Sequence, residues 1–221
     1  KGSEGNRVYE ANWDINKYTV TYNYAENGGT SSTKTSAIVN YGSLIDLTPT
    51  AVKEGYTFVG WNTDKDATTG ISSMKMGTSD VTLYAIYRKD ITLTFVDYKG
   101  TEKTTRTINE IVYNKNTSVT VTAPTINSYT GWTSRYWTTG TGADAGQTVA
   151  GGGTISNVTG NATYYARYYQ NIKVDFNLNG GTGVAPQEIS GNREINSYNV
   201  NVVVNPEITM PATNSTKTGY V

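Results

Sequence analysis

The sequence contains neither cysteine nor histidine. Without cysteine the chain has no disulfide framework, no thiol nucleophile and no thiolate ligand for zinc. Without histidine it lacks the side chain that most often serves as a general base or a metal ligand near neutral pH. These two absences exclude the commonest catalytic and metal-binding arrangements before any motif is considered.

Long apolar runs and an excess of charge of one sign are also missing. No stretch approaches the roughly 20 apolar residues that a membrane-spanning helix needs, and no segment has the layout of a signal peptide. The 18 basic and 18 acidic residues cancel, whereas nucleic acids and anionic membranes require a concentrated basic surface. We therefore expect no nucleic-acid partner and no direct insertion of this segment into a membrane.

Tyrosine and glycine, by contrast, are abundant, with 18 and 23 residues respectively. Tyr, Val and Thr favour strands, and Gly and Asn favour turns. Hydrophobic residues make up only 36% of the sequence, which suits several small cores better than one large core. The composition predicts a mainly β protein of small modules. An α+β arrangement is the alternative, because Ile45–Leu47 could also form one helical turn after Ser43.

Three elements recur in the same order along the chain. They are an alternating strand that ends in an aromatic residue, a Gly-aromatic pair that precedes a Trp, and an Ala separated by one residue from an aromatic. The strands are Tyr18–Tyr22, Ile91–Phe95 and Ile172–Phe176; the Gly and Trp positions are Gly55 with Trp61 and Gly131 with Trp137; the closing elements are Tyr9–Trp13, Leu83–Tyr87 and Tyr164–Tyr168. Pro49, Pro124 and Pro211 stand before the glycines, and Gly219-Tyr220 begins the second element again.

This order predicts the domain organisation. Residues 1–15 are the end of a preceding repeat or a linker, 16–90 are repeat 1, 91–170 are repeat 2, and 171–221 are a partial repeat 3. Repeat 2 diverges and carries a glycine-rich insertion. We expect short links such as Arg88–Asp90 to join the modules into a semi-rigid array, and we expect residues 16–90 to fold alone.

The first repeat closely resembles the internalin-type B-repeat, or Listeria–Bacteroides repeat, of bacterial surface proteins. The resemblance is carried by Val20–Thr30, Gly55–Asp64 and Asp80–Tyr87, and Asn179–Thr182 repeats part of the first string. It implies a small β-grasp-like module, strung along secreted proteins at the bacterial cell surface or cell wall. It also implies a spacer or adhesion-associated role, with no catalytic residue, cofactor or metal. Neighbouring repeats are the expected partners, and host or cell-wall glycans or host proteins are further candidates.

Acidic residues could give the chain a different function in two ways, as a calcium loop or as a catalytic pair of carboxylates. Asp64–Gly70 alternates oxygen ligands as a calcium loop does, but it lacks the glycine at the sixth position and the acid at the twelfth. We interpret it as a hairpin loop. No nucleophile elbow, P-loop or dinucleotide fingerprint is present, and a small sheet leaves little room for a deep pocket with paired carboxylates. We therefore predict that the chain is not an enzyme.

A carbohydrate-binding module is the alternative function, because exposed aromatic rings can stack on sugars. The adjacent aromatic pairs are Tyr164-Tyr165, Tyr168-Tyr169 and Tyr136-Trp137. In a strand, one member of each pair points outward, but such rings also pack against a neighbouring repeat or cover a thin sheet, which is the interpretation we favour. We interpret the insertion Gly140–Gly153 as a flexible hairpin tip, with a binding loop as the alternative.

Overall fold

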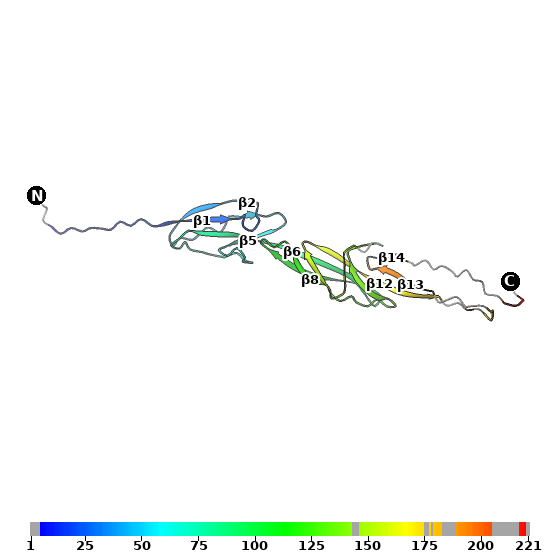
Figure 1. Cartoon of the computed structure of the whole chain (residues 1–221). Helices are drawn as coiled ribbons and strands as arrows, with labels where there is room; N and C mark the ends of the chain where they lie inside the picture. The colour runs from blue at the N-terminus through cyan, green and yellow to red at the C-terminus, as the bar shows by residue number, and fades with distance from the viewer. Residues whose placement is uncertain are drawn as a thin grey trace. The chain divides into compact units, whose positions relative to one another are not determined.

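The computed structural model describes residues 5–142, 146–174, 177, 179–182, 189–204 and 217–219. Every regular element within these residues is a strand (Figure 1), so the predicted mainly β class is confirmed. Ile45–Leu47 forms neither a strand nor a helical turn. The chain divides into two compact units. Unit 1 is Lys1–Asp90 with Ile111–Thr117, and unit 2 is Ile91–Glu110 with Ser118–Val221.

Unit 1 is built on a mixed sheet in the order β3-β1-β6-β5. Its strands are β1 (Lys17–Asn23), β3 (Ser36–Asn40), β5 (Thr57–Asn62) and the first part of β6 (Val81–Lys99). β1 is antiparallel to β3 but parallel to β6, and β5 is antiparallel to β6. The short strands β2 (Ser31–Ser32) and β4 (Ala51–Val52) pair separately. The first and last strands of the unit therefore lie side by side in its centre.

Alternation in the sequence explains which face of β1 is buried. Val20 and Tyr22 point into the core and Thr21 is exposed, as expected of a strand with one buried face. A turn forms at Asn27-Gly28-Gly29 after β1. Gly28 has a φ of +78°, which glycine adopts without steric cost, and a Cβ on Gly29 would overlap the Tyr87 hydroxyl.

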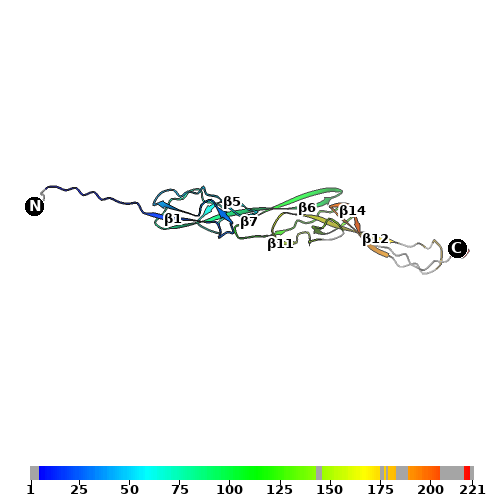
Figure 2. The ribbon, with the colours of Figure 1, turned by 90° about the horizontal axis from the view of Figure 1, so that it is seen from above.

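Unit 2 repeats this arrangement with the later strands. β6 is parallel to β12 (Ala162–Val174), β12 is antiparallel to β9 (Thr133–Thr138), and β7 (Glu102–Tyr113) pairs with β6. The second part of β6 thus takes the place that β1 has in unit 1. The remaining strands are β8 (Val119–Thr122), β10 (Thr148–Val149), β11 (Thr154–Val158), β13 (Ile189–Asn196) and β14 (Asn199–Val204). Figure 2 labels β11 and β14 among them. β8 pairs with β11, and β13 pairs with both β12 and β14.

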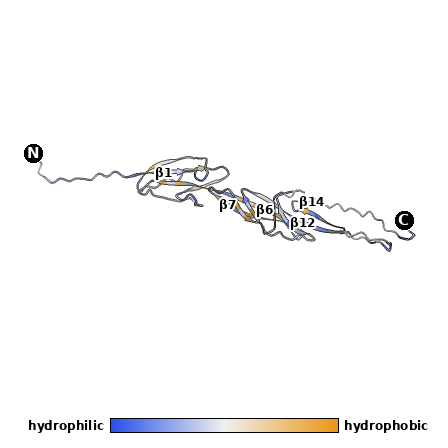
Figure 3. Cartoon of the chain, in the orientation of Figure 1, coloured by the Kyte–Doolittle hydropathy of each residue, from blue (hydrophilic) through white to orange (hydrophobic). Residues whose placement is uncertain are grey.

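Arg88–Asp90 is not the link that the sequence predicts, because β6 continues through it. The segment contains neither Gly nor Pro to interrupt a strand, and Arg88 is paired with Thr57 of β5. Hydrophobic residues lie on the strands of each unit while the connecting segments are mostly polar (Figure 3). Of the predicted third repeat, Asp175, Phe176, Pro211 and Tyr220 lie outside the described residues.

Candidate functional site

The recurring Trp occupies the same environment in both units. The Trp61 indole N–H donates a hydrogen bond to the Pro49 carbonyl at 2.7 Å, and its ring lies 5.1 Å from that of Tyr22 at an interplanar angle of 72°. A buried indole N–H needs such an acceptor. Trp61 is 1% exposed. The strand aromatic, the Pro and the Trp of the recurring pattern therefore meet in the core.

Unit 2 contains the same cluster. Trp137 donates to the Pro124 carbonyl at 2.7 Å, and its ring lies 5.1 Å from that of Phe95, again at 72°. Trp137 is 0% exposed. Both tryptophans therefore lie in the core, and both positions have a structural role.

Both units also share a hydrogen bond from a Thr amide to a side-chain oxygen, at the edge of their parallel strand pair. The Thr19 amide donates to Asp80 Oδ1 at 2.7 Å in unit 1, and the Thr92 amide donates to Asn161 Oδ1 at 2.8 Å in unit 2. Asp80 and Asn161 each stand directly before the closing strand. Sequence reasoning missed this contact, although an acceptor side chain at the same position in both repeats was a usable signal.

The closing aromatics, Tyr87 and Tyr168, are both completely buried. Burial raises the pKa of Tyr87 to about 12, with a smaller contribution from Tyr24. Burial also raises the pKa of Tyr168 far above its ordinary value. Both phenols are therefore neutral at physiological pH and unsuited to acid–base chemistry there. Each hydroxyl donates to a backbone carbonyl, that of Tyr24 or Asn127.

Asn114 is a buried polar residue of unit 1 that comes from the sequence of the second repeat. Its side-chain oxygen accepts a hydrogen bond from the Tyr87 amide at 3.1 Å, and its Nδ2 donates to the Lys65 and Ala67 carbonyls at 3.1 and 2.7 Å. Its backbone amide donates to the Tyr87 carbonyl at 3.0 Å, and its own carbonyl accepts from Lys53 Nζ. Asn114 has a φ of +53°, a conformation that Asn tolerates better than most residues. The segment Ile111–Thr117 is thus anchored in unit 1.

The adjacent aromatic pairs divide into one buried and one half-buried ring each. Tyr164, Tyr168 and Trp137 are buried, and Tyr165, Tyr169 and Tyr136 are half-buried. Two of the half-buried rings have neighbours. Tyr165 packs edge-on against Tyr198 at 5.1 Å, and the Arg135 guanidinium lies 5.2 Å from the Tyr136 ring. These pairs offer no fully exposed ring on which a sugar could stack.

The predicted hairpin loop at Asp64–Gly70 uses its oxygens within the protein. Asp64 Oδ1 accepts from the Asp66 amide at 2.9 Å, and Asn62 Oδ1 accepts from the Asp64 amide at 3.0 Å. The Lys65 carbonyl already accepts from Asn27 and Asn114. Over the part of the chain that the structure describes, no group of three or more acidic side chains is placed to hold a metal ion.

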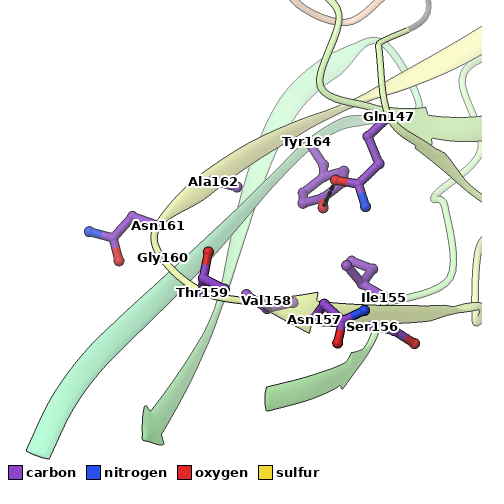
Figure 4. Close-up of a pocket in the computed structure, with 10 residues that line it drawn as sticks. All are labelled: Gln147, Ile155, Ser156, Asn157, Val158, Thr159, Gly160, Asn161, Ala162 and Tyr164. Carbon is purple, nitrogen blue, oxygen red and sulfur yellow. Dashed lines mark hydrogen bonds between the residues drawn. The ribbon is translucent and has the colours of Figure 1, made fainter. Parts of the chain in front are cut away.

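The hollow in Figure 4 lies in unit 2, beside the start of β12, and has a volume of about 230 Å³. Its lining residues are Gln147, Tyr164 and the segment 155–162. Tyr164 donates from its hydroxyl to Gln147 Oε1 at 3.0 Å. Amides, hydroxyls and short apolar side chains make up the rest of the lining, so the hollow has neither a pair of carboxylates nor a nucleophile beside a base.

The insertion Gly140–Gly153 lies near this hollow and is described except for residues 143–145. It is a hairpin, as predicted, because β10 pairs with β9 and the Thr139 amide donates to the Gln147 carbonyl at 3.0 Å. Arg167, 1% exposed, donates to the Gly142 carbonyl at 3.0 Å. The base of the hairpin is therefore held by a buried side chain.

Two units with the same strand order and the same core contacts define a tandem β-repeat protein. Residues 18–86 match the family model described as the Listeria-Bacteroides repeat domain. The resemblance of the first repeat is therefore confirmed, and residues 18–86 are a Listeria-Bacteroides repeat. The family match covers the sheet, Pro49 and Trp61 of unit 1.

Two curated proteins of Evansella cellulosilytica are similar to the chain over most of its length. One, named "Putative Gly-rich membrane protein", is 29% identical over 198 residues, which is 85% of this chain and 21% of that protein. The other, named "Putative membrane protein", is 29% identical over 184 residues, which is 80% of this chain and 25% of that protein. The chain thus spans a fifth to a quarter of the curated relatives it matches.

No solved structure matches the chain significantly. Within the residues that the structure describes, no helix has the length and apolar character needed to cross a membrane.

Proposed function

We propose that the chain is a non-catalytic array of repeat modules in a bacterial cell-surface protein, where it serves as a spacer and an adhesion-associated stalk. The duplicated Trp, Pro and aromatic cluster is the observation that carries this proposal. The residues that recur in the sequence hold each unit in the same fold, as in other proteins built from structural repeats. The family match at 18–86 and the names of the two relatives support an extracellular location at the cell surface.

The exposure of two N-terminal aromatic residues supports neighbouring repeats as partners. Tyr9 and Trp13 occupy the positions that Leu83 and Tyr87 have in unit 1, where both are completely buried. Tyr9 and Trp13 themselves are 84% and 87% exposed. A pattern that is buried in unit 1 and exposed here is suited to packing against another repeat.

Intact cells that produce the parent protein provide the test. An antibody raised against this chain is expected to label unpermeabilised cells, and exchanging the chain for a flexible linker of equal length is expected to reduce attachment while leaving the rest of the protein on the surface. Labelling that appears only after permeabilisation would refute the surface location. Unchanged attachment with the linker would refute the adhesion-associated role.

Fewer observations support the carbohydrate-binding alternative. The half-buried Trp132 stacks on Tyr129 at 5.9 Å and 6°, and Arg193 lies 5.6 Å from the Trp132 ring. A glycan array probed with the whole chain decides between the two functions. Binding that is lost in Trp132→Ala would favour the carbohydrate-binding module, and a complete lack of binding would eliminate it.

A further inference from the structure

The first and closing strands of each unit are parallel neighbours. Val20–Asn23 of β1 pair with Val81–Tyr84 of β6 in unit 1, and Leu93–Val96 of β6 pair with Ala162–Tyr165 of β12 in unit 2. In a parallel pair, the beginning of one strand and the end of the other lie at opposite ends of the ladder. In unit 1, Lys17 at the start of β1 and Asp90 in β6 therefore lie at opposite ends of the parallel ladder. The same holds in unit 2 for the start of its part of β6 and the end of β12.

This arrangement determines how a stretching force acts on the unit. A pull on the two chain connections slides the parallel strands past one another, and all the hydrogen bonds between them share the load. A pull on two strand ends that lie at the same end of the ladder opens the bonds one after another. Forced unfolding is governed by the unfolding rate, so a barrier that requires several bonds to break together gives a higher rupture force.

We propose that the parallel strand pair of each unit is a mechanical clamp that keeps the unit folded when the chain is stretched along its length. The proposal rests on the proposed surface role in one respect, since a stalk that is attached at both ends is the setting in which such tension arises. The clamp itself is a property of each unit and is open to measurement on the isolated chain.

Two features of both units strengthen the ladder. The Thr19 amide bonds to Asp80 and the Thr92 amide to Asn161, so a side chain extends the backbone pairing by one bond in each case. The paired segments also carry completely buried apolar side chains, Leu83 beside Tyr22 and Phe95 beside Tyr164. Shielding from water keeps a competing solvent molecule away from the bonds and strengthens them.

The absence of cysteine permits a sharp test, because two introduced cysteines define the points of attachment without ambiguity. In the full chain, Lys17→Cys with Asp90→Cys attaches the force to the start of β1 and to the far end of the unit 1 part of β6. Lys17→Cys with Ser79→Cys attaches it to β1 and to the residue just before Asp80 and β6, at the same end of the ladder. All three residues are exposed, so both variants keep the same core.

Single-molecule force spectroscopy at one loading rate is expected to give a severalfold higher rupture force for the first pair than for the second. The gain in chain length on rupture identifies unit 1 as the unit that opened, and equal thermal midpoints establish that both variants are folded alike.

Equal rupture forces in the two directions would overturn the clamp. Asp80→Ala in the first pair supplies a second criterion, because it removes the added bond and is expected to lower the rupture force without loss of folding. An unchanged rupture force there would show that the side chain adds nothing to the ladder. Neither result depends on where the parent protein resides, so failure of the clamp and failure of the surface role are distinguishable.

Discussion

Unit 1 and unit 2 have the same core contacts although their sequences differ in most other respects. Tyr22 and Phe95 are different residues, yet each ring meets its Trp at 5.1 Å and 72°. The Asn-Gly-Gly turn that follows β1 has no counterpart in unit 2, where β6 reaches β7 through the residues between Lys99 and Glu102. The comparison indicates that both units depend on the contact between the strand aromatic, the Pro and the Trp, whereas the connections between strands differ.

The largest difference between the units is that unit 1 includes residues from outside its own repeat. Unit 1 takes in the segment Ile111–Thr117, which the sequence places in the second repeat. Asn114 of this segment satisfies the backbone of Lys65, Ala67 and Tyr87. The stability of unit 1 therefore depends on residues beyond its own repeat.

Removal of the core Trp is expected to have the largest effect. Trp61→Ala and Trp137→Ala should each lower the free energy of unfolding of their unit by about 3 to 5 kcal/mol, because a large buried ring is lost and a cavity remains. Urea unfolding followed by far-UV circular dichroism measures both. Trp13→Ala serves as the control and should change stability by less than about 0.5 kcal/mol, since that ring is 87% exposed. Clearly unequal losses at Trp61 and Trp137 would break the equivalence of the two cores.

Alkaline pH is expected to destabilise both units through their buried tyrosines. The folded state raises the pKa of Tyr87 to about 12 from an ordinary value of 10.0. Its contribution to stability is therefore fully present below pH 10 and disappears as the pH rises through 12, a loss of about 2 to 3 kcal/mol by linkage. The pKa of Tyr168 is raised in the same direction.

A pH titration that records tyrosinate absorbance together with circular dichroism tests this expectation. Tyr87→Phe removes the ionisable group and loses only a 3.4 Å hydrogen bond to Tyr24, so the alkaline transition of unit 1 should move to higher pH. The transition of unit 2 is the internal reference and should stay in place. A Tyr87→Phe variant that unfolds at the original pH would contradict the assignment.

Loss of the Asn114 side chain is expected to weaken unit 1 alone. Asn114→Gly keeps the positive φ accessible and removes three hydrogen bonds of a buried side chain. The expected loss is about 1 to 3 kcal/mol, because buried backbone groups of unit 1 are left without partners. Asn116→Gly, at an exposed position in the same turn, is the matched control. The expectation fails if thermal unfolding shows the loss in unit 2 or in both units equally.

The same contact sharpens the expectation that residues 16–90 fold alone. The excised segment lacks Ile111–Thr117, so it should unfold at a lower urea concentration than unit 1 does in the whole chain. Equal midpoints would mean that the Asn114 contacts add nothing to the stability of the unit.

The smallest effect is expected at the edge of the parallel ladders. Asp80→Ala and Asn161→Ala each remove one hydrogen bond to a Thr amide, which is worth about 0.5 to 1.5 kcal/mol and less where water replaces it. Ser79→Ala is the neighbouring control. Denaturant midpoints of the three variants measure the effect, and an equal shift for Asp80→Ala and Asn161→Ala would extend the likeness of the units to their edges.

Much of the fold follows from local features of the sequence. The alternation at Tyr18–Tyr22 predicts the buried face of β1, and the glycines before the aromatics predict turns. Gly55, Gly131 and Gly219 all have positive φ, at +72°, +80° and +82°, which explains why this position is glycine in each repeat. The interpretation of Asp64–Gly70 as a hairpin loop likewise followed from the sequence alone, because the segment lacks the glycine and the acidic residue that a calcium loop needs.

Other features depend on residues that are distant in the sequence. That β6 continues through Arg88–Asp90 reflects its pairing with β5, and no local signal distinguishes a charged link from a charged stretch of strand. The role of Asn114 was hidden for the same reason, because its partners lie 27 to 49 positions away. The β-grasp likeness implied by the resemblance and the domain boundaries predicted from the recurring elements stay predictions.

By itself, the sequence determined that this protein is a tandem array of small β units in which a Trp recurs at the same place. Periodicity and turn chemistry are local properties, and their recurrence establishes the repeat without coordinates. Only the tertiary structure decided that the first and closing strands are parallel neighbours and that Ile111–Thr117 belongs with unit 1. Strand pairing and burial are set by contacts between distant residues, and one sequence does not record which of them meet.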